Sequence, residues 1–406
     1  MSISLLQHTQ SITGFKHIKY EYIGQSVIQH LEWKSKKFHC PCCNSRRTKA
    51  RVYNQRTVKG LAMGRKSFYI KFDHYRIRCK DCKAHVMQKL QFIQNQKSRI
   101  TKPFARSIIE LRQHMTITAT ASYFGVHWEL VKNLELAYLK KKFRKIPLKS
   151  VKHIGIDEIH TGDNIGENGY LTIVRDLDSG ATLFVGKGRT SECLDDFGER
   201  IKRSKCNIKA VAVDMAPSFT HWANKYVEGA VIVYDHFHVI KLMNKKLNEV
   251  RIQTMNKLND EEKKDLKGKK YSFLMNKEDM SATGKEFLDS CKEKFSDLGV
   301  AYYLKESLRN IYRSSESDGA ARIAFKRWCD IAINSGIAKM KTMANTINQH
   351  IEGIVSYWTT SGLTSAKMEG FNTKVKLLIR NAYGYHDEDY LILKIHELPE
   401  IKNVTI

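Results

Sequence analysis

The stretch VKHIGIDEIH, residues 151–160, constrains the fold of this chain more than any other. Its apolar residues are β-branched and the slim Gly155 lies among them, so the run predicts a short buried strand. The strand is predicted to end in two carboxylates, Asp157 and Glu158. An acid at the end of a strand lies where a sheet opens toward solvent, and that position suits a metal ligand better than a core residue.

Later segments repeat this pattern of strands that end in acids. Two strands are predicted after the first, then a helix with Ser191 as its cap, and then two strands that end in Asp214 and Asp235 with a helix between them. These predicted elements are the strands GYLTIVRD (169–176) and TLFVGKG (182–188), the helix at 191–203, and the strands KAVAVD (209–214) and AVIVYD (230–235). This order of elements is that of an RNase H-like fold. The acids of its first and fourth strands are expected to meet on adjacent strands.

Residues 241–350 are rich in Lys, Glu and Leu and carry almost no strand pattern, which predicts an all-helical insertion into this core. Within it, KKDLKGKK (263–270) is predicted to be a loop. The core then needs a closing helix. TSAKMEGFNTKVKLLIRNAYGY fits that helix, with Thr364 or Ser365 as its cap and Gly384 past its end.

The closing helix is predicted to bring one acid and two bases to the same face. Glu369, Asn372, Lys376 and Arg380 lie at i, i+3, i+7 and i+11, a spacing that aligns side chains along a helix. Lys376 and Arg380 can hold a substrate DNA strand there.

Three carboxylates from separate elements, Asp157, Asp214 and Glu369, can together hold two Mg²⁺ or Mn²⁺ ions through oxygen ligands. Two such ions clamp the attacking and the leaving oxygen of an in-line phosphoryl displacement. Two other acids compete for these roles. Strand register favours Asp157 over Glu158, and the basic helix face favours Glu369 over Glu352.

Positive charge is concentrated in the first part of the chain. Residues 1–150 hold 31 Lys and Arg against 7 Asp and Glu, a net of +24, whereas residues 151–406 hold 38 against 35, a net of +3. A chain that is merely Lys-rich would carry its excess along the whole length. A polyanion partner for residues 1–150 is therefore expected.

Five of the nine cysteines fall within residues 40–82. Two C-x-x-C pairs are formed by Cys40, Cys43, Cys79 and Cys82. Each pair can form a tight knuckle, and four thiolates complete the tetrahedron of a structural zinc ion. The 35 residues between the pairs include the strand-like KSFYIKFDHYRIR. Two knuckles joined by a hairpin make a zinc ribbon, although pairing of Cys40 with Cys42 is left open.

A helix-turn-helix is predicted after the cysteines. Thr101 and Pro103 are start signals for a helix that runs to about His114. Beyond it, a small residue, a turn glycine and an apolar anchor have helix-turn-helix spacing. These three are Ala121, Gly125 and Val131, and the other core positions are filled by Phe124, Val126 and Leu134.

The second helix of this motif, at about 127–142, is the expected recognition helix. Lys132 and the tail LKKKFRK (139–145) can contact phosphates. His127 stands where Ser or Thr would normally cap that helix. An ordinary helical hairpin is the alternative, but the flanking positive charge favours DNA binding.

Taken together, these motifs resemble the ISL-three family of bacterial insertion-sequence transposases, members of the DDE class. The resemblance covers essentially the whole chain. It is carried by IGIDE (154–158) with Tyr170 and Thr172, VDM (213–215), DHFHVIK (235–241), EGFNTKVK (369–376) and RNAYGY (380–385). Thr364 and Ser365 depart from the Ser-Asn pair that the family pattern has ahead of its Glu-Gly.

The resemblance implies that Asp157, Asp214 and Glu369 are a catalytic triad that works with Mg²⁺ or Mn²⁺. It also implies a supporting role near the scissile phosphate for the element Asp235-x-x-His238. The implied activity is strand cleavage at terminal inverted repeats followed by strand transfer into double-stranded target DNA, by a dimer or larger synaptic complex. The expected alternatives are a DNA-binding regulator derived from a transposase and an RNase H-like nuclease.

The expected architecture is an α+β or α/β multidomain chain. Its predicted domains are a zinc ribbon (1–98), a helix-turn-helix (99–146), the first part of an RNase H-like mixed-sheet core (147–240), the helical insertion (241–350) and the closing helix with a C-terminal tail (351–406). No run of about 18 apolar residues and no signal peptide is found, so a cytoplasmic, nucleoid-associated bacterial protein without membrane contact is expected.

Overall fold

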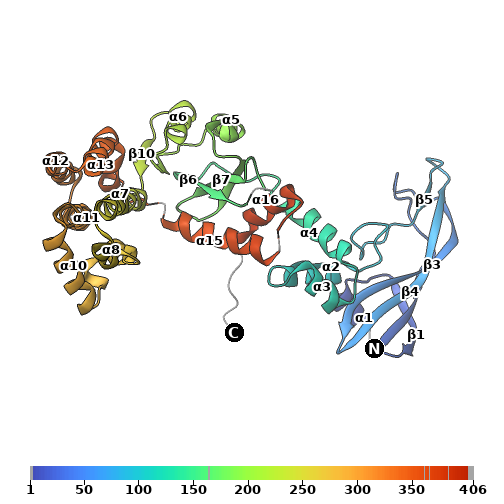
Figure 1. Ribbon diagram of the computed structural model, residues 1–406. Helices are drawn as coiled ribbons and strands as arrows, with labels where there is room; N and C mark the ends of the chain where they lie inside the picture. The colour runs from blue at the N-terminus through green and yellow to red at the C-terminus, as the bar shows by residue number, and fades with distance from the viewer. Residues whose placement is uncertain (1–2, 163–164, 361, 365, 383, 401–406) are drawn as a thin grey trace. The chain divides into compact units, whose positions relative to one another are not determined.

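The computed structural model describes residues 3–162, 165–360, 362–364, 366–382 and 384–400. The chain divides into two compact units, unit 1 with residues 1–142 and unit 2 with residues 143–406 (Figure 1). Among the described helices, none offers an apolar stretch sufficient to traverse a lipid bilayer.

Unit 1 combines a twisted sheet with a group of three helices. Its elements are α1 (Ile3–Gln10), β1 (Phe15–Ile23), β2 (Ser26–Trp33), β3 (Thr48–Met63), β4 (Lys66–Cys79), β5 (His85–Met87), α2 (Lys102–Arg112), α3 (Ile117–Phe124) and α4 (Trp128–Lys142). The sheet order is β1-β2-β4-β3, and β5 adds to β4. The long β3–β4 hairpin is the one predicted between the two cysteine pairs.

Helices α2, α3 and α4 of unit 1 form the predicted helix-turn-helix. Thr101 caps α2 by accepting a hydrogen bond from the N–H of Phe104. Gly125 ends α3 in the left-handed conformation at φ 58°, which glycine adopts without the steric penalty of a side chain. Ala121 and Val131 are buried in one cluster that joins the three helices.

Unit 2 is built on a second five-stranded sheet. Its strands and the helices between them are β6 (His153–His160), β7 (Tyr170–Asp176), β8 (Thr182–Lys187), a 3₁₀ turn (Ser191–Leu194), α5 (Asp195–Ser204), β9 (Ala210–Val213), α6 (Pro217–Tyr226) and β10 (Val231–Tyr234). The strand order is β10-β9-β6-β7-β8. Pairs β6–β7 and β7–β8 are antiparallel, while β6–β9 and β9–β10 are parallel. This is the RNase H-like arrangement that the sequence predicted.

Helices cover both faces of this sheet, with α5 and α6 on one side and α15 (Ala366–Asn381) and α16 (Glu388–Glu397) on the other (Figure 1). Alternate strand residues therefore enter different clusters. Ile154 and Ile156 pack with Trp222 of α6. Ile159 belongs to the opposite cluster, with Met368 of α15.

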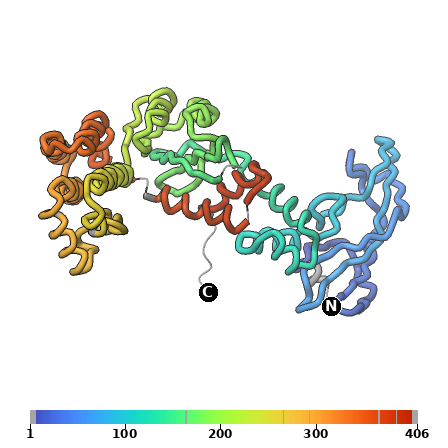
Figure 2. The backbone as a smooth tube through the Cα atoms, in the orientation of Figure 1, coloured from blue at the N-terminus to red at the C-terminus, as the bar shows by residue number. Residues whose placement is uncertain are grey.

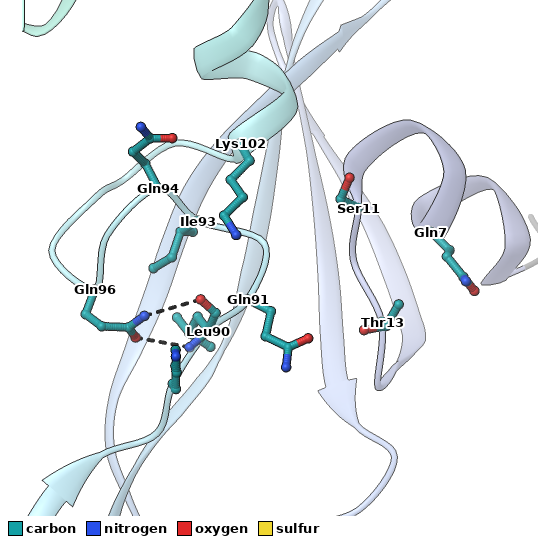
Figure 3. Close-up of a pocket in the computed structure, with 10 residues that line it drawn as sticks. Gln7, Ser11, Thr13, Leu90, Gln91, Ile93, Gln94, Gln96 and Lys102 are labelled. Atoms are coloured by element: carbon teal, nitrogen blue, oxygen red, sulfur yellow. Dashed lines mark hydrogen bonds between the residues drawn. The ribbon is translucent and has the colours of Figure 1, made fainter. Parts of the chain in front are cut away.

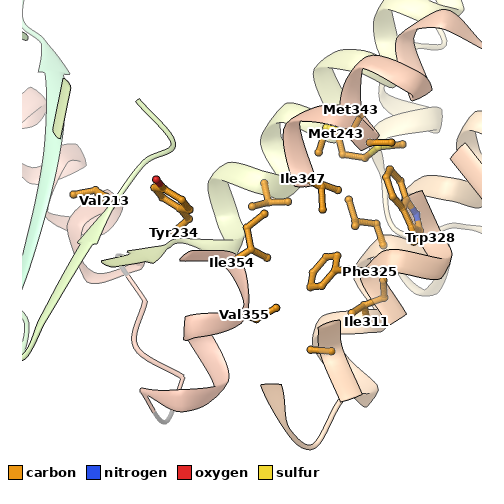
Figure 4. Packing of buried hydrophobic residues seen from close by; sticks show 14 of the residues in the cluster. Val213, Tyr234, Met243, Ile311, Phe325, Trp328, Met343, Ile347, Ile354 and Val355 are labelled. Carbon is orange, nitrogen blue, oxygen red and sulfur yellow. The ribbon is translucent and has the colours of Figure 1, made fainter. Parts of the chain in front are cut away.

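The segment between β10 and the closing helix is helical, as predicted. Its helices are α7 (His236–Lys257), α8 (Asp260–Leu266), α9 (Lys270–Leu274), α10 (Ala282–Lys294), α11 (Ser296–Ser314), α12 (Asp318–Asn334), α13 (Ala338–Gln349) and α14 (Ile351–Thr359), with a 3₁₀ turn at Lys277–Asp279. Figure 2 follows the chain through these helices and back to α15 and α16. Met243, Phe325, Trp328, Met343 and Ile347 form part of their buried core (Figure 4).

Two local predictions were wrong. KKDLKGKK is not a loop throughout, because Asn259 and Glu262 form a capping box that starts α8 and Leu266 at its end is fully buried. Ser191 does not cap a helix but begins a 3₁₀ turn after Thr190. The predicted C-terminal tail contains α16 and a 3₁₀ turn at Leu398–Glu400. The proposed cap at Ser365 lies outside the described residues.

Candidate active site and zinc centre

The sheet brings Asp157 and Asp214 to neighbouring strands. Parallel pairing of β6 with β9 aligns His153 with Ala210 and Gly155 with Ala212. Continued by two residues, this register sets Asp157 level with Asp214, which directly follows β9. The prediction that the first and fourth strands lie side by side is confirmed.

Asp157 does not end its strand, contrary to the prediction. Strand β6 runs on to His160, because its other edge pairs with β7 as far as Tyr170. The pairing with β9 stops at Gly155. Asp157 therefore lies inside β6 but beside the place where β9 ends, so the sheet opens next to its carboxylate.

Strand alternation places Asp157 and Glu158 on opposite faces of the sheet. Because successive side chains of a strand point to opposite faces, Asp157 shares the α15 face with Gly155 and Ile159, whereas Glu158 points the other way. The Nδ2 atom of Asn372 on α15 donates a hydrogen bond of 2.7 Å to Oδ2 of Asp157. The Oδ1 atom accepts from the N–H of Glu158 at 2.9 Å.

Electrostatics link these acids to a histidine. Burial raises the pKa of Asp157, and the charge of Asp214 raises it further. His238 acts in the opposite direction and lowers that pKa. The pKa of Glu158 is raised by burial first and by Asp214 second. A low-dielectric site with adjacent acids favours a bound cation, which would offset their repulsion.

Asp235 and His238 both lie at the start of α7. Asp235 is 1% exposed and caps the helix by accepting a hydrogen bond from the N–H of Phe237. His238 follows one turn later and is half-buried. Asp235 thus fixes the start of α7, the helix that carries His238. The charge of His238 lowers the pKa of Asp157.

The predicted face of α15 has one buried and three exposed members. Asn372 is 8% exposed, whereas Glu369, Lys376 and Arg380 are exposed. Glu369 lies three residues before Asn372 on the same helix. Within the described part of the chain, no set of three carboxylate ligands closes to within 4.8 Å, and only the cysteines do so.

Sequence reasoning did not identify Arg175, which anchors the start of α15. Its Nη1 donates to the carbonyl of Lys367 at 2.8 Å, and its guanidinium lies 4.0 Å from the ring centre of Phe371. Lys367 in turn donates to the carbonyl of Leu177 at 2.9 Å. Burial lowers the pKa of Arg175 to about 10. A basic residue near the end of the predicted strand YLTIVRD was the available signal.

The four predicted cysteines of unit 1 converge. The ligand atoms of Cys40, Cys43, Cys79 and Cys82 all lie within 4.8 Å of one another, and Cys42 is not part of this set. Backbone N–H groups, first that of Cys43, lower the pKa of Cys40 to about 6. Four sulfur ligands with an available thiolate fit a tetrahedral zinc ion with no open position.

The helix-turn-helix is tied to the sheet through its turn. The Nζ of Lys59 on β3 donates to the carbonyls of Phe124 and Gly125, at 2.7 and 3.0 Å. His127 partly supplies the missing cap, because its Nδ1 accepts from the N–H of Glu129 at 3.4 Å. Lys132 is half-buried on α4.

A cavity of about 690 Å³ in unit 1 contains none of the predicted site residues. Its lining is polar and amide-rich, with Gln7, Gln91 and Gln94 and the side chain of Lys102 (Figure 3). The amide of Gln96 exchanges two hydrogen bonds with the backbone of Leu90. These bonds hold together the two ends of the loop formed by residues 90–96.

Two family models match parts of the chain. The chain matches a family model described as Transposase (DDE_Tnp_ISL3) over residues 154–395. Residues 36–82 match a model described as the zinc-finger of transposase IS204/IS1001/IS1096/IS1165, and this range includes all four clustered cysteines.

The similar proteins are transposases. The transposase for insertion sequence element IS1001 of Bordetella parapertussis is 26% identical over 92% of this chain and 91% of that protein. The transposase for IS1557 of Mycobacterium tuberculosis (strain ATCC 25618 / H37Rv) is also 26% identical, over 60% of this chain and 59% of that one. A solved Drosophila P element transposase strand transfer complex aligns with a TM-score of 0.43 and 12% identity, over 78% of this chain and 95% of that chain. Because the first family model spans more than half of the chain, the protein belongs to the ISL3 family of DDE transposases.

Proposed function

We propose that this transposase binds the terminal inverted repeats of an insertion sequence through unit 1 and cleaves and joins DNA at Asp157, Asp214 and Glu369. The observation that supports this proposal is the β6–β9 register, which pairs Gly155 with Ala212, each two residues before one of the aspartates. Asn372 links Asp157 to the helix that carries Glu369.

In the proposed reaction, water attacks the phosphorus at each element end and frees a 3′-OH, which then attacks target DNA. Mg²⁺ or Mn²⁺ bound by the three carboxylates would polarise the phosphoryl oxygens and activate the nucleophile. Among the described residues, neither Asp157 nor Asp214 forms an ion pair with Lys or Arg that would compete with a bound cation. Asp157 is oriented by Asn372.

Other residues would act on the substrate. His238 and its helix-capping neighbour Asp235 are proposed to support the scissile phosphate. Lys376 and Arg380 are exposed on α15 and are proposed to hold the substrate strand. Lys132 on α4, which is half-buried, is proposed to contact a phosphate of the bound DNA. The four cysteines are proposed to hold a structural zinc ion.

The assembly and location are also proposals. Two element ends must be held together, so we expect a homodimer or a larger synaptic complex that works in the bacterial cytoplasm at the nucleoid. The finer division of the two units at residues 98, 146, 240 and 350 is kept as part of this proposal.

The test is strand cleavage of labelled inverted-repeat duplex with Mg²⁺. Asp157→Asn and Glu369→Gln are each expected to abolish cleavage while repeat binding persists. The matched control is Glu352→Gln, because Glu352 is bound by Arg322 at 2.6 and 2.8 Å on the helical segment. Full cleavage by Asp157→Asn contradicts the assignment. Repeat binding without any metal-dependent cleavage by the unaltered chain indicates a regulator, and preferred cleavage of RNA–DNA hybrid indicates an RNase H-like nuclease.

A further inference from the structure

The zinc end of the β3–β4 hairpin places cations directly opposite one another. In the antiparallel register, Lys49 pairs with Arg78, and Arg51 pairs with Arg76. Directly opposed residues of an antiparallel pair lie on the same face of the sheet, with their Cβ atoms about 4.5–5.5 Å apart. Four positive side chains therefore form two adjacent rows on one face.

At this end of the hairpin, the cationic face lies opposite the small buried cluster of Phe38, Tyr75 and Ile77. The pair between the two rows, Ala50 and Ile77, lies on the opposite face, where Ile77 is fully buried in a cluster with Phe38 and Tyr75. On the cationic face, Lys49, Arg51 and Arg78 are exposed. Arg76 is half-buried, because its guanidinium lies 4.5 Å from the ring centre of Tyr53.

The strand segments that carry these charges contain no acid. The segments 48–53, 76–79 and 85–87, which form this part of the sheet, contain no Asp or Glu. In the described residues the four cations form no ion pair, although other cations of unit 1 do. Arg47 lies 3.0 Å from Asp81, and Lys16 lies 2.9 Å from Glu32.

Directly opposed like charges destabilise a sheet. Two such rows side by side, without acids, weaken the hairpin unless an anion neutralises them. The zinc knuckle holds the strands in this register, because Thr48 pairs with Cys79, one residue from the first row. The cations therefore form a rigid platform whose charge fits a phosphodiester backbone.

We propose that this face, which we call the ribbon platform (Lys49, Arg51, Arg76 and Arg78), binds the phosphate backbone of duplex DNA. The inference rests on the proposed function, since it adds a second DNA contact to the helix-turn-helix. Its contacts position the duplex and do not read its sequence, because phosphates carry no direct sequence information. Arg76 is held by Tyr53, which preserves its planar group for bidentate phosphate contact.

The test compares two double variants of the full chain by fluorescence anisotropy on repeat and scrambled duplexes over a range of salt. Arg51→Gln with Arg78→Gln removes one cation from each row. The control, Lys16→Gln with Lys36→Gln, removes the same charge from two lysines that both pair with Glu32. The platform variant is expected to lower the magnitude of the slope of log K against log salt by about 2, one for each lost phosphate contact. The affinity of the platform variant for both duplexes should fall by the same factor.

A second readout separates binding from folding. Because the substitutions relieve repulsion, the thermal midpoint of the platform variant should equal or exceed that of the unaltered chain. Affinity and salt slope equal to those of the control overturn the inference but leave the proposed function intact. An unaltered chain that binds neither duplex overturns both. A lower thermal midpoint in this variant and in a second double variant, Lys49→Gln with Arg76→Gln, also overturns the inference.

Discussion

Asn372 joins the closing helix to the first core strand, because its Nδ2 donates a 2.7 Å hydrogen bond to Oδ2 of Asp157 across 215 positions of the chain. The other oxygen of Asp157 accepts from the backbone N–H of Glu158. Both carboxylate oxygens are thus held in direction. A ligand fixed in this way needs little reorganisation when a cation binds.

Replacing Asn372 should impair catalysis more than folding. We expect Asn372→Ala to reduce the Mg²⁺-dependent cleavage rate about 10–100-fold, the usual effect of losing a partner that orients a metal ligand. The apparent affinity for Mg²⁺ should fall with it. Titration of the cleavage rate with Mg²⁺ measures both. Lys374→Ala on the exposed side of α15 is the matched control, and equal titration curves for the two variants contradict the prediction.

Gly155 allows the closing helix to approach the sheet. A Cβ atom there would lie 2.8 Å from Cδ2 of Leu177 and 3.2 Å from Met368 on α15. Gly155→Ala should therefore lower the free energy of unfolding by about 1–3 kcal/mol through overpacking. Urea unfolding measures it. Gly370→Ala on α15, where a Cβ meets nothing within 4 Å, should be neutral or stabilising.

Local patterns were enough to predict the elements that carry the site. Alternating and β-branched residues marked β6, β9 and β10, and the small residue, glycine and apolar anchor at Ala121, Gly125 and Val131 marked the helix-turn-helix. The spacing of the two C-x-x-C pairs predicted the cysteine cluster. Each of these signals depends on residues close together in sequence, whose physical meaning does not need the rest of the fold.

Contacts between distant segments could not be predicted in this way. Strand β6 extends past Asp157 because β7 pairs with it, and helix α8 forms because Leu266 finds a buried position. The role of Arg175 depends on the carbonyl of Lys367, which belongs to another element. Sequence periodicity describes a segment alone, whereas these outcomes are decided by its neighbours.

Removal of zinc should unfold the ribbon end of unit 1. We expect Cys79→Ser to release about one equivalent of zinc per chain and to lower the thermal midpoint, since structural zinc contributes directly to folding. A colorimetric zinc assay after gel filtration measures the loss. Cys42→Ser should keep its zinc, because Cys42 lies outside the clustered set. Zinc loss in Cys42→Ser together with retention in Cys79→Ser would reverse the assignment.

His396 should make unit 2 less stable in mild acid. Burial lowers the pKa of His396, whose Nδ1 hydrogen-bonds to the carbonyl of Thr182 at 3.0 Å. Because the folded pKa is below the unfolded one of about 6.5, the neutral form stabilises the fold above that pH, and this contribution is lost as pH falls. His396→Asn keeps a donor without the titration, so its thermal midpoint should fall less from pH 7.5 to 5.5. His386→Asn, a change at an exposed site, should show the same fall of the thermal midpoint from pH 7.5 to 5.5 as the unaltered chain.

Arg112 of α2 and Glu135 of α4 form a buried ion pair that joins two helices of the helix-turn-helix. Their Nε and Oε2 atoms lie 2.8 Å apart, and the side chains are only 10% and 2% exposed. Glu135→Gln would leave the guanidinium buried without its counter-charge. We expect the free energy of unfolding of unit 1 to fall by about 3–5 kcal/mol.

Helix α2 carries its own control for that prediction. Arg106 and Glu110 form a pair of nearly the same length, 3.0 Å, but their side chains are 82% and 62% exposed. Glu110→Gln should therefore change stability by less than about 1 kcal/mol, because water screens an exposed pair. Urea unfolding of both variants, followed by circular dichroism, measures the difference. Equal losses would mean that burial does not set the strength of these pairs. If Arg112→Met with Glu135→Leu recovers most of the lost stability, the loss comes from an isolated buried charge and not from missing attraction.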